Sequence, residues 1–246
     1  AVVQPAHVAT LARMRRAIGS VDVPITSYFS MVKDDRAERV VAEAKLAYVS
    51  RDVAGTPLAD IALLASVAPL KCGGRAGASH FVDIAQGPVS ARAVADMQPF
   101  SNHLSVVQMC GDEVLEWLEK GVSVYNQMHP NAPAQFLFDR DTPTYNREAV
   151  YGLAYDVDLT QPARYAADGT RINERARRVI NATWQGQAVV ADHPFLLVTN
   201  DYRGGGGGHF PMLGAERVLD LPTARLRDVV TDYISGDLGR PPQEVP

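Results

Sequence analysis

Arginine, aromatic and amide side chains beside glycines are the residues whose types and spacing suggest binding chemistry in this sequence. The stretch LKCGGRAG places Arg75 directly after Gly73 and Gly74. A turn of this kind can bring backbone amides and a guanidinium to a phosphate or a ribose. A solvated turn residue is the alternative interpretation of Arg75.

A second stretch, DMQPFSNHL, sets Phe100 and Asn102 two residues apart. In an extended loop both side chains point the same way, one as a flat apolar face and the other as an amide donor and acceptor. Because Phe100 follows a proline and not a polar turn residue, a core aromatic is the alternative for this ring.

The third stretch, TNDYRGGGGGHF, places Tyr202 at the expected end of a strand and follows it with five glycines, among them Gly206 and Gly207. Glycine loses more conformational entropy on folding than any other residue, so such a run is costly unless backbone approaches another group closely. A flexible loop is the alternative. Two rings and an amide can hold a nucleobase, since stacking contributes about 1 to 3 kcal/mol per base.

Recognisable catalytic motifs are absent from the sequence. None of the histidines form an HxH or HExxH pattern, which argues against a self-contained metal centre. No GxSxG stretch indicates a serine nucleophile. The glycine run is not a phosphate-binding P-loop, because His209 and Phe210 stand where lysine and serine or threonine are required. The six histidines are His7, His80, His103, His129, His193 and His209.

Composition limits the possible partners. With 246 residues and 46% hydrophobic content, the chain can build one large domain or two small ones. A net charge of -4 gives no general attraction to a nucleic-acid polymer. No apolar run approaches the roughly 20 residues that cross a bilayer, so we expect no membrane partner and a soluble chain whose export signal has been removed. Cys72 and Cys110 are too few for a disulfide framework, and buried free thiols are favoured over a bridge.

Hydrophobic periodicity predicts a mixture of helices and strands. Helices are expected over Asp35–Tyr48, through Val114–Leu118 after a turn at Gly111 and Asp112, and over Thr223–Ser235. Strands are expected over Ile61–Leu70, Leu104–Cys110, Val150–Leu159, Arg177–Trp184 and Phe195–Tyr202, with a turn at Gln185–Gln187. This pattern favours the α+β class over a regular parallel α/β sheet.

The order of these segments resembles the C-terminal domain of the 5'-nucleotidase family. The stretches that carry the resemblance are SYFSMVKDD, APLKCGGRAG, ADMQPFSNHLSVVQMCGDEVLEWLE, YNQM, TYN, DVDLTQPARY and VTNDYRGGGGGHF. DLTQPARY, the EWLE helix and the tyrosine-to-glycine segment resemble most closely the periplasmic branch with 2',3'-cyclic-nucleotide 2'-phosphodiesterase and 3'-nucleotidase activity. The resemblance implies a layered α/β/β/α sandwich over residues 27–246. Residues 1–26 would be a lead-in from a preceding metallophosphoesterase domain.

In this family the C-terminal domain recognises the nucleoside, while a covalently linked N-terminal domain carries two divalent metal ions and the catalytic groups. The resemblance therefore implies a nucleoside or nucleotide as partner, with no catalytic residue, cofactor or metal in this chain, and an exported or periplasmic protein. Phe100 and Tyr202 match the two aromatics that sandwich the base, and Asn102 matches the residue at the base edge. Arg75 in its glycine turn matches an arginine that reaches toward sugar or phosphate, and the glycine run lets the nucleoside lie close to backbone.

Several positions depart from the family pattern, and alternatives stay open. Gly205 stands where close relatives usually have an aromatic, Arg147–Leu153 differs from the usual stretch, and Gly208 replaces an aspartate with which 5'-nucleotidases bind ribose hydroxyls. One alternative is 5'-nucleotidase or UDP-sugar hydrolase specificity, and another is a docking domain without a ligand. A third is an independent phosphohydrolase whose groups would come from near the Arg75 turn, namely His80, Asp83, Asp96 and His103.

Overall fold

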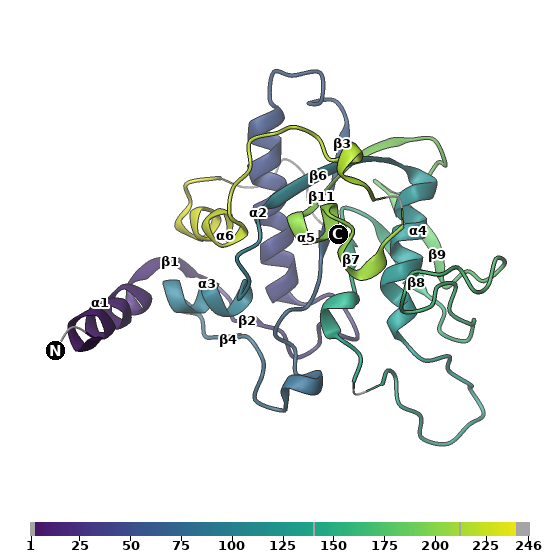
Figure 1. The fold of residues 1–246 in the computed structure, drawn as a ribbon, viewed down its shortest axis with the longest axis horizontal. Helices are drawn as coiled ribbons and strands as arrows, with labels where there is room; N and C mark the ends of the chain where they lie inside the picture. The colour runs from purple at the N-terminus through teal and green to yellow at the C-terminus, as the bar shows by residue number, and fades with distance from the viewer. Residues whose placement is uncertain (1–2, 140, 212, 240–246) are drawn as a thin grey trace.

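A four-stranded sheet forms the centre of the computed structural model, which describes residues 3–139, 141–211 and 213–239 (Figure 1). Its strand order is β6 (Leu104–Cys110), β11 (Pro194–Asn200), β3 (Ala62–Val67) and β7 (Ala149–Tyr151). Strand β11 runs parallel to β3 and antiparallel to β6, and β7 runs antiparallel to β3. The sequence predicts β6 with its observed bounds, and β3 within a longer apolar run.

Helices cover both faces of this sheet, because alternate side chains of each strand point to opposite sides. On one face, Leu63, Ala65 and Val198 belong to the core that includes side chains of α2 (Arg36–Val53) and α6 (Leu226–Ser235). On the other face, Leu64 and Leu197 belong to the core of α4 (Gly111–Gly121). The predicted α+β class is confirmed, and the predicted helices at α2 and α6 are confirmed with shifted ends.

Helix α4 begins directly at Gly111, so the predicted turn at Gly111 and Asp112 is wrong. The glycine is required by a close approach instead, since a Cβ atom on Gly111 would collide with the carbonyl oxygen of Val190. The first turn is closed by the Glu113 carboxylate, which accepts a hydrogen bond of 2.9 Å from the Cys110 backbone N–H. Strand β6 therefore passes into α4 without a connecting loop.

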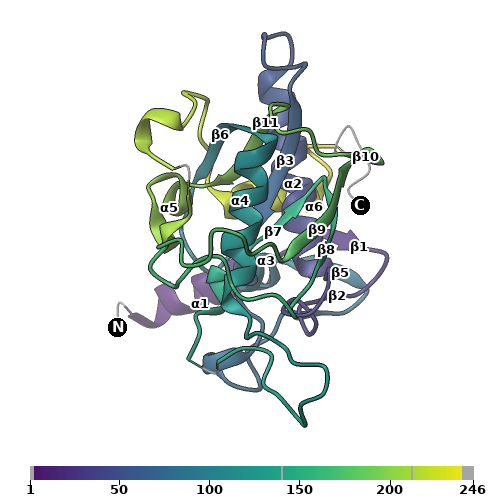
Figure 2. The same cartoon turned by 90° about the vertical axis from the view of Figure 1, so that its right-hand side faces the viewer.

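A second sheet packs beside α4, as Figure 2 shows. It contains β10 (Gln187–Ala188), β9 (Val179–Trp184) and β8 (Ala154–Val157), in that order. The single strand predicted over Val150–Leu159 is two strands, because Gly152 adopts a φ of 100° between β7 and β8. The predicted turn between β9 and β10 is confirmed, with positive φ at Gln185 and Gly186 as a tight hairpin requires.

The first residues of the chain contribute two strands to the domain. Within the expected lead-in of residues 1–26, β1 (Ala17–Val21) pairs with β5 (Gly87–Ser90), and β2 (Ile25–Thr26) pairs with β4 (Asp83–Ile84). Ile25 is fully buried. Helix α1 (Val3–Arg15) buries none of its side chains and lies against α3 (Ala91–Met97), with its free end directed away from the domain (Figure 1).

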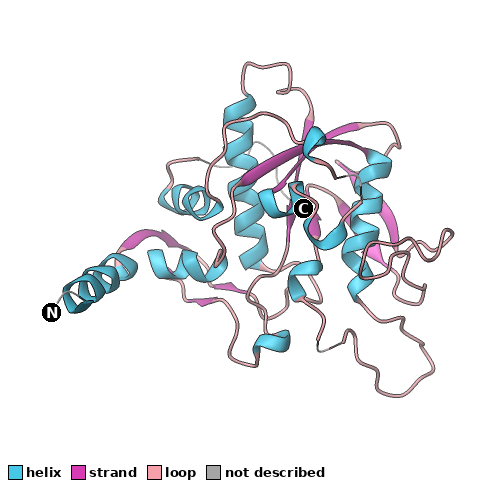
Figure 3. Cartoon of the chain, in the orientation of Figure 1, coloured by secondary structure: helices cyan, strands magenta, loops and turns pink. Residues whose placement is uncertain are grey.

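Short helical turns and long loops complete the chain (Figure 3). The turns are η1 (Gly74–Ala76), η2 (Val122–Val124), η3 (Thr144–Asn146), α5 (Asp201–Gly204), η4 (Gly207–His209) and η5 (Ala215–Arg217). No helix in the described ranges is both long enough and apolar enough to span a membrane.

Candidate nucleotide site

The pairing of β6 with β11 brings two of the predicted site segments together. Leu104, the first residue of β6, pairs with Asn200, the last residue of β11. The loop that carries Phe100 and Asn102 therefore ends where the segment that carries Tyr202 begins. The Asn102 amide Nδ2 donates a hydrogen bond of 2.8 Å to the Asp201 carboxylate, which joins the two segments directly.

Tyr202 lies in the short helix α5 and not on a strand end, so the predicted strand over Phe195–Tyr202 is two residues too long. The side chain of Asn200 accepts a hydrogen bond of 2.9 Å from the Arg203 backbone N–H and caps this helix. Asparagine is among the most favoured N-cap residues, and this local preference starts a helix at Asp201 and ends the strand at Asn200.

Both predicted stacking rings are exposed to solvent at this end of the sheet. The exposed fraction is 52% for Phe100 and 47% for Tyr202. A core aromatic is buried, so that alternative for Phe100 is wrong. A half-exposed ring has apolar area available for a flat ligand.

Asp201 places a negative charge beside the amide of Asn102. Burial opposes ionisation of this carboxyl, but hydrogen bonds from Asn102 and from the Tyr202 backbone N–H outweigh it, and the pKa of Asp201 lies below its usual value. The bond to Asp201 uses an N–H of Asn102, which orients the amide and leaves its oxygen to accept from a ligand.

The glycine run after Tyr202 packs against the chain itself. A Cβ atom on Gly207 would lie 2.5 Å from Cε2 of the Tyr202 ring, and a Cβ atom on Gly208 would collide with the Arg203 guanidinium. Gly206 and Gly208 also adopt positive φ angles of 89° and 75°. Glycine is therefore required here by close packing on Tyr202 and Arg203, a reason that the sequence did not suggest.

Substitution of two glycines in this run should separate packing on the ring from general loop effects. Gly207→Ala should move the Tyr202 ring and weaken any ligand stacked on it, because the added methyl overlaps the ring edge. Gly205→Ala is the matched control, since its Cβ would meet only the Asp201 carbonyl at 3.2 Å and the Tyr202 carbonyl at 3.8 Å. Titration with adenosine checks this, and equal affinities of the two variants would contradict it.

Arg75 lies on a second part of the surface, in η1. The preceding glycines have positive φ angles, and a Cβ on Gly73 would lie 2.6 Å from the Phe81 ring. The turn packs on η3, where the Arg75 guanidinium carbon lies 5.9 Å from the centroid of the Tyr145 ring. No carboxylate in the described ranges forms an ion pair with Arg75, so its charge is available to an anionic ligand.

Arg203 lies between these two parts of the site and was not predicted. Its side chain is 1% exposed, and its Nε donates a 2.6 Å hydrogen bond to Glu148. Its Nη1 donates to the carbonyl of Gly207 at 2.9 Å, and its Nη2 donates to the carbonyl of Tyr145. Arg203 lies in the stretch NDYR and Tyr145 in the stretch TYN, but nothing in either stretch indicates that these two residues contact each other.

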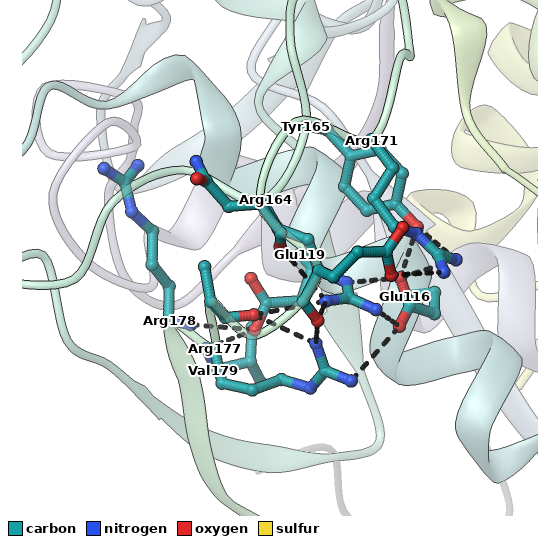
Figure 4. A network of polar contacts seen from close by, with 11 residues as sticks. Glu116, Glu119, Arg164, Tyr165, Arg171, Arg177, Arg178 and Val179 are labelled. Atoms are coloured by element: carbon teal, nitrogen blue, oxygen red, sulfur yellow. Dashed lines mark hydrogen bonds and ion pairs between the residues drawn. The ribbon is translucent and has the colours of Figure 1, made fainter.

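The EWLE helix and the DLTQPARY stretch contact each other, as Figure 4 shows. Glu116 of α4 accepts two hydrogen bonds of 2.8 Å from Arg164 and another from Tyr165. Glu119 accepts from the backbone N–H groups of Arg178 and Val179 at 2.8 and 2.9 Å. These two stretches therefore attach the loop before β9 to α4.

Three of the four residues considered for an independent phosphohydrolase are held by separate partners. Asp83 accepts a hydrogen bond from Tyr28, Asp96 pairs with Lys71 at 2.8 Å, and His103 lies 3.4 Å from Asp201. Among residues 3–139, 141–211 and 213–239, no three histidine, cysteine or acidic side chains form a group that could hold a metal ion. The two cysteines, Cys72 and Cys110, are free thiols.

Comparison with known proteins decides the family. The model of the 5'-nucleotidase, C-terminal domain, matches residues 17–215. The chain belongs to this family. This C-terminal domain is 36% identical over 238 residues to the 2',3'-cyclic-nucleotide 2'-phosphodiesterase/3'-nucleotidase of Salmonella typhimurium, covering 95% of the chain and 37% of the relative. It is 34% identical over 233 residues to the trifunctional nucleotide phosphoesterase protein YfkN of Bacillus subtilis, covering 94% of the chain and 16% of the relative.

Solved structures show the same fold for this C-terminal domain. A 5'-nucleotidase precursor from Thermus thermophilus matches with a TM-score of 0.65 at 18% identity, over 99% of this chain and 40% of that one. The NAD nucleotidase of Haemophilus influenzae matches with a TM-score of 0.58 at 14% identity, over 96% and 38%. The domain thus spans well under half of each relative and neighbour named here, all of which are longer proteins.

Proposed function

We propose that this domain recognises the substrate of a nucleotide phosphoesterase and binds the nucleobase between Phe100 and Tyr202. The observation that carries the proposal is the placement of two half-exposed rings on segments joined by the hydrogen bond from Asn102 to Asp201. Stacking on aromatic rings tolerates any base, so the oriented Asn102 amide supplies selectivity at the base edge. The name of the relative from Salmonella typhimurium supports nucleotides with phosphate on the 2' or 3' oxygen as the proposed substrate class.

The polar part of the nucleotide is assigned to the η1 turn. Arg75 offers a guanidinium with no acidic partner in the described ranges, and the positive φ angles of Gly73 and Gly74 form the turn that carries it. A guanidinium binds phosphate oxygens through two parallel hydrogen bonds. At the other end of the ligand, the backbone of Gly206 and Gly207 lies beside Tyr202, the proposed base-stacking ring. We assign hydrolysis itself to two divalent metal ions and catalytic groups on a preceding domain. We also propose that the whole protein is exported.

Calorimetric titration with adenosine, 3'-AMP and 5'-AMP tests the proposal. Phe100→Ala and Tyr202→Ala should each weaken adenosine binding by about 5- to 150-fold, the equivalent of about 1 to 3 kcal/mol of stacking. Phe136→Ala is the control, because this exposed ring lies on the long loop between η2 and η3. Affinities like that of the wild type in both site variants would exclude the stacked base.

The same titration distinguishes the alternatives. Tighter binding of 5'-AMP than of 3'-AMP would indicate 5'-nucleotidase specificity. A docking domain predicts no binding of any of the three ligands. That alternative has one supporting observation, since helix α1 buries none of its side chains and offers Val3, Val8 and Leu11 to a partner surface.

A further inference from the structure

Arg203 contacts the part of the site at Tyr202 directly, and it contacts η3, on which the Arg75 turn packs. Its guanidinium carbon lies 5.2 Å from the centroid of the Tyr202 ring and 4.4 Å from that of the Phe210 ring. Its hydrogen bonds to Gly207 and Tyr145 reach the glycine run and η3. Two segments distant in sequence, residues 202–210 and η3, thus share contacts with one side chain.

This side chain is fixed in place by its own partners. A buried charge is costly unless it is paired and hydrogen-bonded, and Glu148 provides the pair for Arg203. The second oxygen of Glu148 accepts a 3.0 Å hydrogen bond from the indole N–H of Trp117, a fully buried residue of α4. Arg203 is therefore attached to the core of the domain, and its planar guanidinium presents N–H groups in a fixed geometry.

The contacts extend from Arg203 to the predicted anion-binding residue. Tyr145, whose carbonyl accepts from Arg203, carries the ring that lies beneath Arg75. A Cβ on Gly74 would lie only 2.8 Å from Thr144, so the η1 turn and η3 are in close contact as well. A continuous set of contacts thus leads from Tyr202 through Arg203 and Tyr145 to Arg75.

We propose that Arg203 is the positioning residue of the site and sets the spacing between the base-stacking ring of Tyr202 and the guanidinium of Arg75. The inference rests on the proposed function, because it presumes that one nucleotide contacts both parts. A ligand that reaches both parts depends on this spacing, whereas a nucleoside without phosphate depends on the ring alone. Arg203 therefore determines how much a phosphate adds to the affinity of a nucleoside.

Arg203→Lys tests this assignment, since lysine keeps the charge opposite Glu148 but cannot reproduce the planar set of bonds to Gly207 and Tyr145. The affinity for 3'-AMP should fall at least about tenfold, and the preference of the domain for 3'-AMP over adenosine should disappear. Arg217→Lys is the matched control, because Arg217 pairs with Glu113 in a more exposed position and should retain the preference. An unchanged preference in Arg203→Lys would overturn the inference.

A second pair of variants keeps the test valid if Arg203→Lys does not fold. Tyr145→Ala leaves the carbonyl that accepts from Arg203 in place but removes the ring on which Arg75 lies, so it should also abolish the preference for 3'-AMP. Tyr145→Phe keeps the ring and should retain the preference, and retention in both would overturn the inference. If the wild-type domain binds neither ligand, the proposed function itself is wrong. If the wild type binds both ligands and these substitutions have no effect, only the proposed role of Arg203 is wrong.

Discussion

Arg164→Ala should lower the free energy of unfolding of this domain by about 3 kcal/mol, the lower end of the range for breaking a buried ion pair. Arg164 is buried, and it makes both 2.8 Å hydrogen bonds to Glu116 as well as bonds to the backbone carbonyls of Asn173 and Ala176. Its removal leaves the Glu116 carboxylate without its main partner and takes one of two donors from each of these carbonyls. Tyr165 and Arg171 still contact Glu116 and limit the loss.

Urea denaturation measures this effect, and Arg177→Ala provides the matched control. Arg177 also faces Glu116, but at 3.8 Å and with a side chain that is 53% exposed. An exposed pair of this kind contributes less than about 1 kcal/mol, so the control should be close to the wild type. Equal destabilisation by the two substitutions would show that the buried geometry of Arg164 has no special role.

The free energy of unfolding of the wild-type domain should fall as the pH rises from about 4.5 to about 7, because of Glu38. Glu38→Gln should remove this decrease. Burial raises the pKa of Glu38 from 4.5 to about 7, and the ion pair with Arg147 offsets this only in part. In this interval the folded chain holds a proton on Glu38 that the unfolded chain has released. The free energy of unfolding therefore falls as the pH rises, by about 3 kcal/mol in total from this group.

Denaturation at several pH values between 4 and 8 measures the difference in slope between Glu38→Gln and the wild type. The slope is the relevant quantity, because above about pH 7 the substitution also removes the charge opposite Arg147 and so changes the absolute stability there. Glu174→Gln, which removes an exposed glutamate, is the control. A pH dependence in Glu38→Gln identical to that of the wild type would mean that Glu38 does not hold the proton.

Local patterns predicted the elements whose signals lie within one stretch of sequence. The branched residues of β6 gave this strand with its observed bounds, and the patterns of α2, α6 and β11 gave these elements with small errors at their ends. The errors occurred where a single residue overrides a pattern. Asn200 caps a helix and ends β11, and Gly152 divides one predicted strand into two.

The sequence indicates why three of the proposed site residues lie near one another, but it does not indicate the contacts that support them. Phe100, Asn102 and Tyr202 adjoin the ends of two strands, and those strands pair so that the three residues lie at one end of the sheet. In its local sequence, Arg203 resembles a charged residue before a flexible loop. Its burial follows from contacts with Glu148 and Tyr145, which are distant in sequence, and no local pattern reports such contacts.

The interior position of β11 constrains the order in which this polypeptide can acquire its native topology. Strands β3 and β6 are synthesised first, yet they flank β11, whose residues begin only at Pro194. Until that segment emerges from the ribosome, the hydrogen-bonding groups on the inner sides of β3 and β6 have no native partner. Such non-local pairing slows folding and leaves aggregation-prone intermediates, so nascent chains of this protein should depend on chaperones for longer than their size suggests.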